Sequence, residues 1–275
     1  MDQKTEDIEL TLLLDAIYRK YNYDFRDYAM ASIKRRLSHA KTHFHCRSYS
    51  ALQDLVLYDA SVLPMLLSYL TVQVSEMFRD PAYFQAIRQQ VIPHLRTYPS
   101  LKIWIAGCSS GEELYSLVIL FREEELESRT IFYATDINPD ALEKAEAGVY
   151  DISRISQFTD NHRKSGGKSS LSDYYTAAYG RAVFDKSLRK QVVFSDHSLA
   201  SDAVFAEMQF ISCRNVLIYF GRDLQNRAVG LFKDSLSRQC FLGLGSKESI
   251  RFTDHITAFS DFSRSERIYQ KRELP

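Results

Sequence analysis

Apolar residues recur at steps of three and four positions over the first seventy residues, which is the period of an amphipathic helix. The clearest stripe consists of Leu10, Leu13, Leu14, Ile17 and Tyr18. Between Glu6 and about Leu70, signals typical of strands are nearly absent. We therefore predict a small all-helical domain over residues 1–75.

The pattern changes after Asp80, where short apolar runs typical of strands appear and several are followed by helical stretches. These runs are residues 102–106, 130–135, 191–194, 209–212 and 241–244. Strands that alternate with helices predict a largely parallel sheet, here in a second domain over residues 76–275. Within it, a polar loop at 165–172 precedes two β-rich runs separated by a charged turn. These runs predict a hairpin in a small antiparallel β-subdomain at about 165–194.

Composition narrows the range of partners and compartments. Lysine plus arginine equals aspartate plus glutamate at 35 each, and no basic stripe lined by aromatic residues is present, which argues against nucleic acid. The four cysteines stand far apart, as expected in a reducing cytoplasm. The acidic N-terminus has no apolar signal region, and no run approaches the roughly 18 apolar residues of a membrane span. We expect a cytoplasmic protein without direct membrane insertion.

We expect no metal site, since the His43 and His45 pair beside Cys46 has poor ligand spacing for a helix.

The segment from Gly107 to Glu113 joins an apolar strand to a helix expected to begin near Glu112. Its glycines, Gly107 and Gly111, let the backbone pass close to a ligand. A phosphate loop would often supply a lysine or leave the helix N-terminus free for an anion. Two glutamates stand there instead, and they suit a cationic ligand such as a sulfonium or amino group. The residues leave open a second interpretation, in which these glutamates only complement the helix dipole.

Asp136 ends the second predicted strand and is well placed to accept hydrogen bonds from ribose hydroxyls. Ligands of open α/β sheets bind beyond the carboxyl ends of the strands, so this turn and the Gly107 loop belong to one candidate site. Taken alone, Asp136 could equally begin an Asp-x-Asn-Pro turn.

Three ordered motifs resemble those of the chemotaxis receptor glutamate methyltransferase family, CheR. They are GCSSGEELYS from Gly107, DINPDALEKAEAGVY from Asp136 and CRNVLIYF from Cys213, and SEMFRDPAYF upstream extends the similarity over nearly the whole chain. The resemblance implies a Rossmann-like class I S-adenosylmethionine (SAM)-dependent methyltransferase with an N-terminal helical domain and a small antiparallel β-subdomain. It implies methyl transfer from SAM to glutamate carboxylates of chemoreceptors for sensory adaptation, with S-adenosylhomocysteine as product. The cofactor contacts that it implies are Gln73, Ser75, Arg79, Gly107, Glu112, Asp136, Ser198, Leu199, Arg214 and Asn215.

No catalytic histidine or cysteine is expected, because a glutamate carboxylate is already an ionised nucleophile near neutral pH. The sequence departs from the family pattern at Leu114, where a proline is usual, and at Gly245-Ser246-Lys247-Glu248, near a usual G-H-S-E. These departures leave open a SAM-binding regulatory module with little or no activity. A third hypothesis, a methyltransferase acting on a small molecule or nucleic acid, is disfavoured by the helical domain and the neutral charge.

Lys34, Arg35 and Arg36 form a basic cluster on a predicted helix, which on its own fits a solvated helix face. The resemblance implies that they dock the acidic cytoplasmic helices of methyl-accepting chemoreceptors. In the family, a β-subdomain with an extra glycine-containing loop binds a pentapeptide at the C-terminus of some receptors. Residues 174–194 are short for that insertion, so we expect recruitment that does not depend on the pentapeptide.

Overall fold

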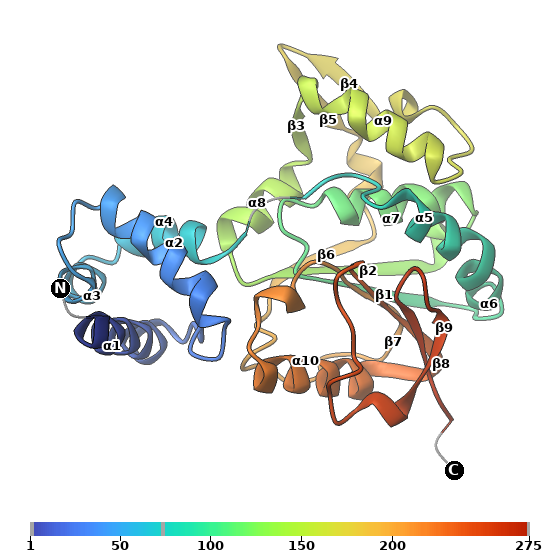
Figure 1. Ribbon diagram of the computed structural model, residues 1–275. Helices are drawn as coiled ribbons and strands as arrows, with labels where there is room; N and C mark the ends of the chain where they lie inside the picture. The colour runs from blue at the N-terminus through green and yellow to red at the C-terminus, as the bar shows by residue number, and fades with distance from the viewer. Residues whose placement is uncertain (1–2, 73–74, 274–275) are drawn as a thin grey trace.

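The computed structural model describes residues 3–72 and 75–273, and its N-terminal part is entirely helical (Figure 1). The four helices are α1 (Gln3–Tyr21), α2 (Met30–His43), α3 (Tyr49–Tyr58) and α4 (Val62–Leu70). Helix α1 packs on α3 and α2 packs on α4, around a core that includes Leu13, Ile33, Leu52 and Leu66. The helical N-terminal domain predicted from the three- and four-residue period is thus confirmed.

A seven-stranded sheet forms the centre of the second part of the chain, in the order β6-β2-β1-β7-β8-β10-β9. Its strands are β1 (Leu101–Ala106), β2 (Thr130–Asp136), β6 (Val192–Asp196), β7 (Met208–Cys213), β8 (Leu236–Leu244), β9 (Phe259–Ser263) and β10 (Ile268–Lys271). Strand β10 is antiparallel to both of its neighbours, β8 and β9, and the other neighbouring pairs of the sheet are parallel. Each of the five apolar runs predicted as strands lies in this sheet, which confirms a Rossmann-like α/β fold.

Helices cover both faces of the sheet (Figure 1). They are α5 (Pro81–Ala86), which continues through η1 (Ile87–Val91) into α6 (Ile92–Leu95), then α7 (Glu112–Glu123), α8 (Pro139–Ala147) and α10 (Arg222–Ser235). Alternate residues of β1 enter different cores: Ile103 and Ile105 belong to the core that contains α7, and Trp104 to the core that contains α10. Burial on both faces is expected of a central parallel strand, and it fixes the end of β1 as a rigid origin for the next loop.

A separate three-stranded antiparallel sheet, with order β3-β5-β4, projects from the main domain. It consists of β3 (Val149–Asp151), β4 (Tyr175–Ala178) and β5 (Arg181–Phe184), with α9 (Ile155–Lys164) between β3 and β4. The β-subdomain is confirmed, but the predicted hairpin was paired wrongly. Strand β5 pairs with β4 across the turn Tyr179-Gly180, and β6 joins the main sheet beside β2. Both turn residues have positive φ, as a tight hairpin requires, and Tyr-Gly is a less familiar signal than Asn-Gly.

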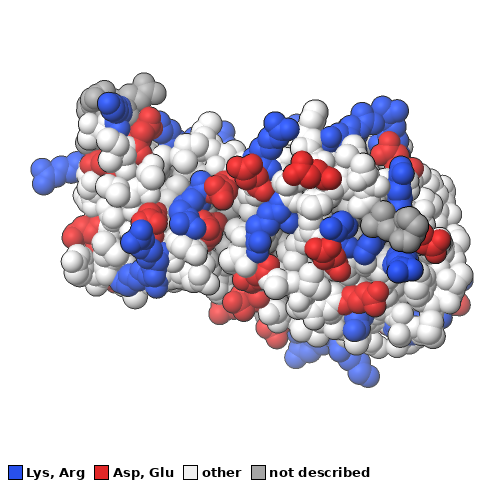
Figure 2. Space-filling model, turned by 90° about the horizontal axis from the view of Figure 1, so that it is seen from below, with Lys and Arg blue, Asp and Glu red and all other residues white. Residues whose placement is uncertain are grey.

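Short 3-10 turns complete the secondary structure: η2 (Glu127–Arg129), η3 (Ile152–Arg154), η4 (Leu171–Tyr174), η5 (Lys186–Arg189), η6 (Leu217–Tyr219) and η7 (Ile256–Ala258). Within the described ranges, no helix is both long and apolar enough to span a bilayer. Basic and acidic side chains are interspersed over the face seen in Figure 2, in agreement with the zero formal net charge.

Candidate active site

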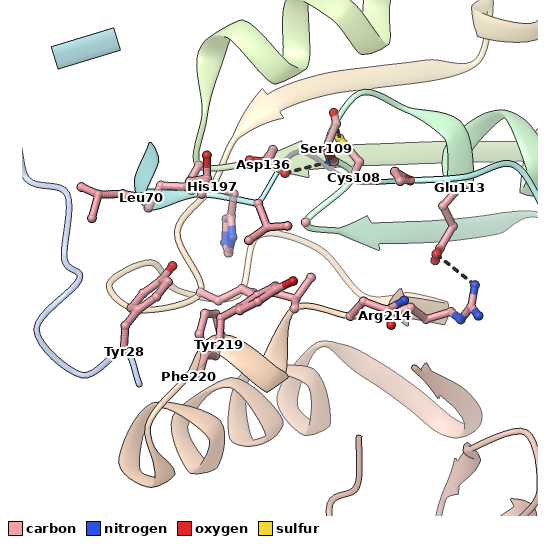
Figure 3. Close-up of a pocket in the computed structure, with 18 of the residues that line it drawn as sticks. Tyr28, Leu70, Cys108, Ser109, Glu113, Asp136, His197, Arg214, Tyr219 and Phe220 are labelled. Carbon is pink, nitrogen blue, oxygen red and sulfur yellow. Dashed lines mark hydrogen bonds and ion pairs between the residues drawn. The ribbon is translucent and has the colours of Figure 1, made fainter. Parts of the chain in front are cut away.

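A cavity open to solvent lies beyond the carboxyl ends of β1, β2 and β7, and Tyr28 of the helical domain lines one side of it (Figure 3). Its empty space, about 910 Å³, includes adjoining solvent. Seven of the predicted cofactor residues line it: Ser75, Arg79, Gly107, Asp136, Leu199, Arg214 and Asn215. Gln73 lies outside the described residues. Glu112 and Ser198 are described but do not belong to the lining, and Ser198 instead accepts a hydrogen bond from the Ala200 N–H within its own turn.

Asp136 is held at the end of β2 by two backbone hydrogen bonds. Its Oδ2 accepts from the N–H of Ser109 at 2.8 Å, and its Oδ1 accepts from the N–H of Asn138 at 3.0 Å. Burial raises the pKa of Asp136, while these bonds act in the opposite direction. Asp136 therefore starts the turn before α8 and also lines the cavity, and its contact with ribose hydroxyls stays a prediction.

The two glycines of the loop are required for different contacts. Gly107 has φ +74° and a Cβ there would lie 2.5 Å from the Val216 side chain. Gly111 has φ +90° and a Cβ there would lie 2.9 Å from the Cβ of Ala145 in α8. Glycine thus allows the loop after β1 to pass close to both the turn after β7 and helix α8.

Helix α7 begins at Glu112, as predicted, but its two glutamates point to different surroundings. Glu112 is fully buried, and its carboxylate accepts from Arg154 Nη1 at 2.7 Å and from the Ser110 hydroxyl at 2.8 Å. Glu113 lines the cavity instead, and accepts from the Ser212 hydroxyl at 2.6 Å and from Arg214 Nη1 at 3.2 Å. Arginine therefore compensates both charges, and direct contact between Glu112 and a cofactor stays a prediction.

Arg214 is a buried link between segments, with only 1% of its side chain exposed. Its Nη2 donates to Asp80 Oδ2 at 2.8 Å and to the carbonyl of Arg79 at 3.0 Å, and its guanidinium lies 4.1 Å from the ring centre of Tyr83. Together with the bond to Glu113, these contacts fix the position of the Arg79 backbone. The Arg79 side chain lines the cavity and has no ion pair among the described residues.

The three basic residues predicted to dock the receptor, Lys34, Arg35 and Arg36, lie in three different environments on α2. Lys34 pairs with Asp7 of α1, and Arg35 is exposed. Arg36 is 8% exposed and lines the cavity, where its Nη1 donates to the carbonyl of Leu70 at 2.6 Å and its guanidinium lies 4.5 Å from the Tyr219 ring centre. Within the described ranges, its buried Nη2 has no hydrogen-bond partner. Burial lowers the pKa of Arg36.

Aromatic residues that sequence reasoning did not single out form another part of the wall: Tyr28, His197, Tyr219 and Phe220 (Figure 3). Tyr219 and Phe220 belong to the CRNVLIYF motif, so their position carried a signal. Tyr28 comes from the helical domain and contacts Phe220 edge-on, with ring centres 4.9 Å apart. Burial, and then the Asp136 charge, raise the pKa of Tyr28, which keeps its hydroxyl protonated.

A mostly parallel sheet, a glycine loop after β1 and an aspartate that closes β2 define a Rossmann-like class I SAM-dependent methyltransferase. Two family models match: "CheR methyltransferase, all-alpha domain" over residues 8–71 and "CheR methyltransferase, SAM binding domain" over residues 73–265. The chain therefore belongs to the CheR methyltransferase family, and its cofactor is SAM.

Relatives of known name cover most of the chain. The protein named Cher3 from Pseudomonas putida is 55% identical over 269 residues, 98% of both chains. The chemotaxis protein methyltransferase of Listeria innocua is 32% identical, over 70% of this chain and 71% of its own. Chemotaxis protein methyltransferase 1 of Pseudomonas aeruginosa is 30% identical, over 70% and 72%. Among solved structures, SAM-bound magnesium protoporphyrin IX methyltransferase of Synechocystis is 13% identical, covers 96% of this chain and 97% of its own, and has a TM-score of 0.38.

Proposed function

We propose that this chain esterifies glutamate side chains of methyl-accepting chemoreceptors by holding SAM and the substrate carboxylate together in the cavity between its domains. The observation that carries this proposal is the composition of the cavity wall. Asp136 comes from the Rossmann-like sheet, and Tyr28 and Arg36 come from the helical domain. Family membership supports the same activity, and no observation on the chain favours a module without turnover.

The described residues fit SAM in charge and hydrogen bonding. The Asp136 carboxylate is fixed by two N–H groups and retains acceptor capacity for ribose hydroxyls. Arg79, without an ion pair among the described residues, is suited to the methionine carboxylate. The Arg36 Nη2, buried and without a partner in the described part of the chain, is suited to a second carboxylate, that of the substrate glutamate.

When bound, SAM would supply a methyl group on a cationic sulfur: a bond from the carboxylate oxygen to the methyl carbon would replace the carbon–sulfur bond, S-adenosylhomocysteine would leave, and no proton would be transferred. The protein therefore has to align the substrate and exclude water. Arg36 would orient the glutamate, since its guanidinium is fixed by the Leu70 carbonyl and the Tyr219 ring. The aromatic side chains of Tyr28 and Phe220 would limit access of water to the carboxylate. No general base is required, and Cys108, whose pKa is raised well above its usual value by burial, is unsuited to act as a nucleophile.

The test is methylation of a purified cytoplasmic receptor fragment with tritium-labelled SAM. We expect labelled protein that releases volatile methanol in alkali, because a methyl ester is base-labile. A matched fragment with glutamine at the methylated positions should remain unlabelled. SAM binding without alkali-labile labelling of the native fragment would instead support the regulatory module.

The finer part of the proposal concerns recruitment in the cytoplasm. The exposed Arg35, with Lys34 beside it, would dock the acidic cytoplasmic helices of the receptor. The β4–β5 connection is a two-residue turn, which supports recruitment without a C-terminal pentapeptide. Receptor fragments with and without such a pentapeptide should be methylated at equal rates, and saturable binding of the peptide in calorimetry would contradict this part alone.

A further inference from the structure

A buried carboxylate lies directly behind the part of the cavity wall that follows β7. Glu248 is 4% exposed and sits in the turn after β8. Among the described residues, the lining includes Asn215 and Val216 but not Glu248. A charged group in this position needs hydrogen-bond partners, because an unpaired buried charge is strongly unfavourable.

The partners of Glu248 are backbone N–H groups. Its Oε2 accepts from Gly245 at 2.7 Å and from Asn215 at 2.9 Å, and its Oε1 accepts from Ile218 at 3.2 Å. Burial raises the pKa of Glu248, and these bonds oppose the rise. The Glu248 carboxylate, from the turn after β8, thus accepts hydrogen bonds from two backbone positions after β7, Asn215 and Ile218.

The turn that Glu248 holds includes a residue in the left-handed region. Asn215 has φ +59°, which asparagine adopts more readily than most other residues with a side chain, so the sequence permits this turn and the bonds from Glu248 hold it in place. The next residue, Val216, fills the space where Gly107 has no Cβ. Arg214 anchors the near side of the turn through Glu113 and Asp80, and Glu248 holds its far side.

We propose that Glu248 is a positioning residue for cofactor binding. Its carboxylate holds the backbone of Asn215–Ile218 in the conformation that closes the cavity after β7, and it does so without touching the cavity. This inference rests on the proposed function in so far as SAM occupies the cavity. Through the Ile218 N–H, the same carboxylate also fixes η6, which carries Tyr219.

Glu248→Gln tests the proposal with a change of one atom. The amide NH₂ would face backbone N–H donors in place of a carboxylate oxygen, so at least one of the three bonds becomes a donor–donor contact. We expect the dissociation constant for SAM in calorimetry to rise about 10- to 100-fold. Hydrogen exchange at the Asn215 and Ile218 amides should accelerate, whereas exchange in the helical domain should not. Lys247→Gln, which changes an exposed side chain in the same turn, should leave both measurements unchanged.

A purely structural role would lower the melting temperature while the folded variant bound SAM as tightly as the native protein. Affinity within about twofold of native in folded Glu248→Gln would therefore overturn the proposal. If that variant does not fold, the native protein supplies the test. Its Asn215 and Ile218 amides should exchange slowly, and fast exchange there would overturn the proposal. Failure of the native protein to bind SAM would contradict the proposed function instead.

Discussion

At the residue scale, each carboxylate oxygen of Asp136 already accepts a backbone N–H, and the residue also lines the cavity. We expect Asp136→Asn to weaken SAM binding about 10- to 100-fold, since the amide must turn its NH₂ toward one of these N–H groups and loses the charge. Calorimetric titration with SAM measures the effect. Asp140→Asn, which changes an exposed side chain in the first turn of α8, is the control. Unchanged affinity in Asp136→Asn would remove Asp136 from the site.

The raised pKa of Asp136 predicts a pH dependence of cofactor affinity. Burial shifts this pKa upward, so the carboxylate takes up a proton at a higher pH than an exposed aspartate would. Affinity that depends on the ionised form is complete above the raised pKa and is lost as the pH falls through it. Titrations with SAM at decreasing pH should show this loss in the native protein and a flatter profile in Asp136→Asn. Parallel profiles for the two proteins would contradict the assignment.

Sequence motifs located the site at the residue scale but not the direction of every side chain. The pair Glu112 and Glu113 identified the start of α7, yet only the rotation of the helix decides which of them faces the cavity. Similarly, Arg36 belongs to a basic cluster but is buried, because α4 brings the Leu70 carbonyl to it from 34 residues further along the chain. Contacts of this kind arise from tertiary packing, and local pattern does not contain them.

At the scale of secondary-structure elements, helix α7 extends from the cavity to a buried cluster of charged side chains. Its Glu123, with 2% of the side chain exposed, pairs with Arg88 and accepts from His162 Nε2 of α9 at 2.9 Å. The Ser169 hydroxyl adds a bond at 2.9 Å from the loop before η4. The cluster thus joins the β-subdomain side of the molecule to the helix that starts at the cofactor loop.

Glu123→Gln should destabilise the protein by about 1–3 kcal/mol, because it removes one of the two carboxylates that pair with the buried Arg88 and leaves only Glu124 as its counter-charge. Burial acts to raise the pKa of Glu123, but His162 and Arg88 outweigh it and lower the pKa from 4.5 to about 2. The contribution of Glu123 is therefore present above pH 4.5 and is lost as the pH falls toward 2. Thermal unfolding at neutral and acidic pH measures both effects, and exposed Glu125→Gln is the control. Equal stability of Glu123→Gln and the native protein at neutral pH would exclude the cluster as a structural link.

The order of elements could be predicted better than their pairing. Apolar runs identified five strands of the main sheet, because buried parallel strands are continuously apolar. Strands β9 and β10 were missed, and β3, with three residues, is too short for a pattern of its own. Leu114, which replaces a usual proline, lies in the first turn of α7 and packs in the core. At this position proline and leucine differ little in backbone hydrogen bonding.

A pair of backbone hydrogen bonds joins the two domains at the scale of the whole molecule. The Ala29 N–H donates to the Tyr219 carbonyl at 2.9 Å, and the Gly221 N–H donates to the Asp27 carbonyl at 2.6 Å. Tyr28 and Phe220 face each other within this bridge. The bridge includes the lining residues Tyr28, Tyr219 and Phe220, so it positions the helical-domain wall of the cavity and the substrate site should depend on it.

Gly221→Ala should open this bridge, because a Cβ at Gly221 would lie 2.6 Å from the Asp27 carbonyl oxygen, and backbone on both sides has to move. The φ of Gly221 is −66°, so alanine brings no backbone strain of its own and the effect reports on the close approach alone. Displacement of Tyr28 and Arg36 by about 1 Å should lower receptor methylation roughly 10²-fold. Methyl-ester formation and hydrogen exchange at the Ala29 amide are the two measurements, with exposed Arg222→Ala as the neighbouring control. If the variant methylates the receptor at the native rate although its Ala29 amide exchanges fast, the bridge is open and activity does not depend on it. That result would contradict the prediction.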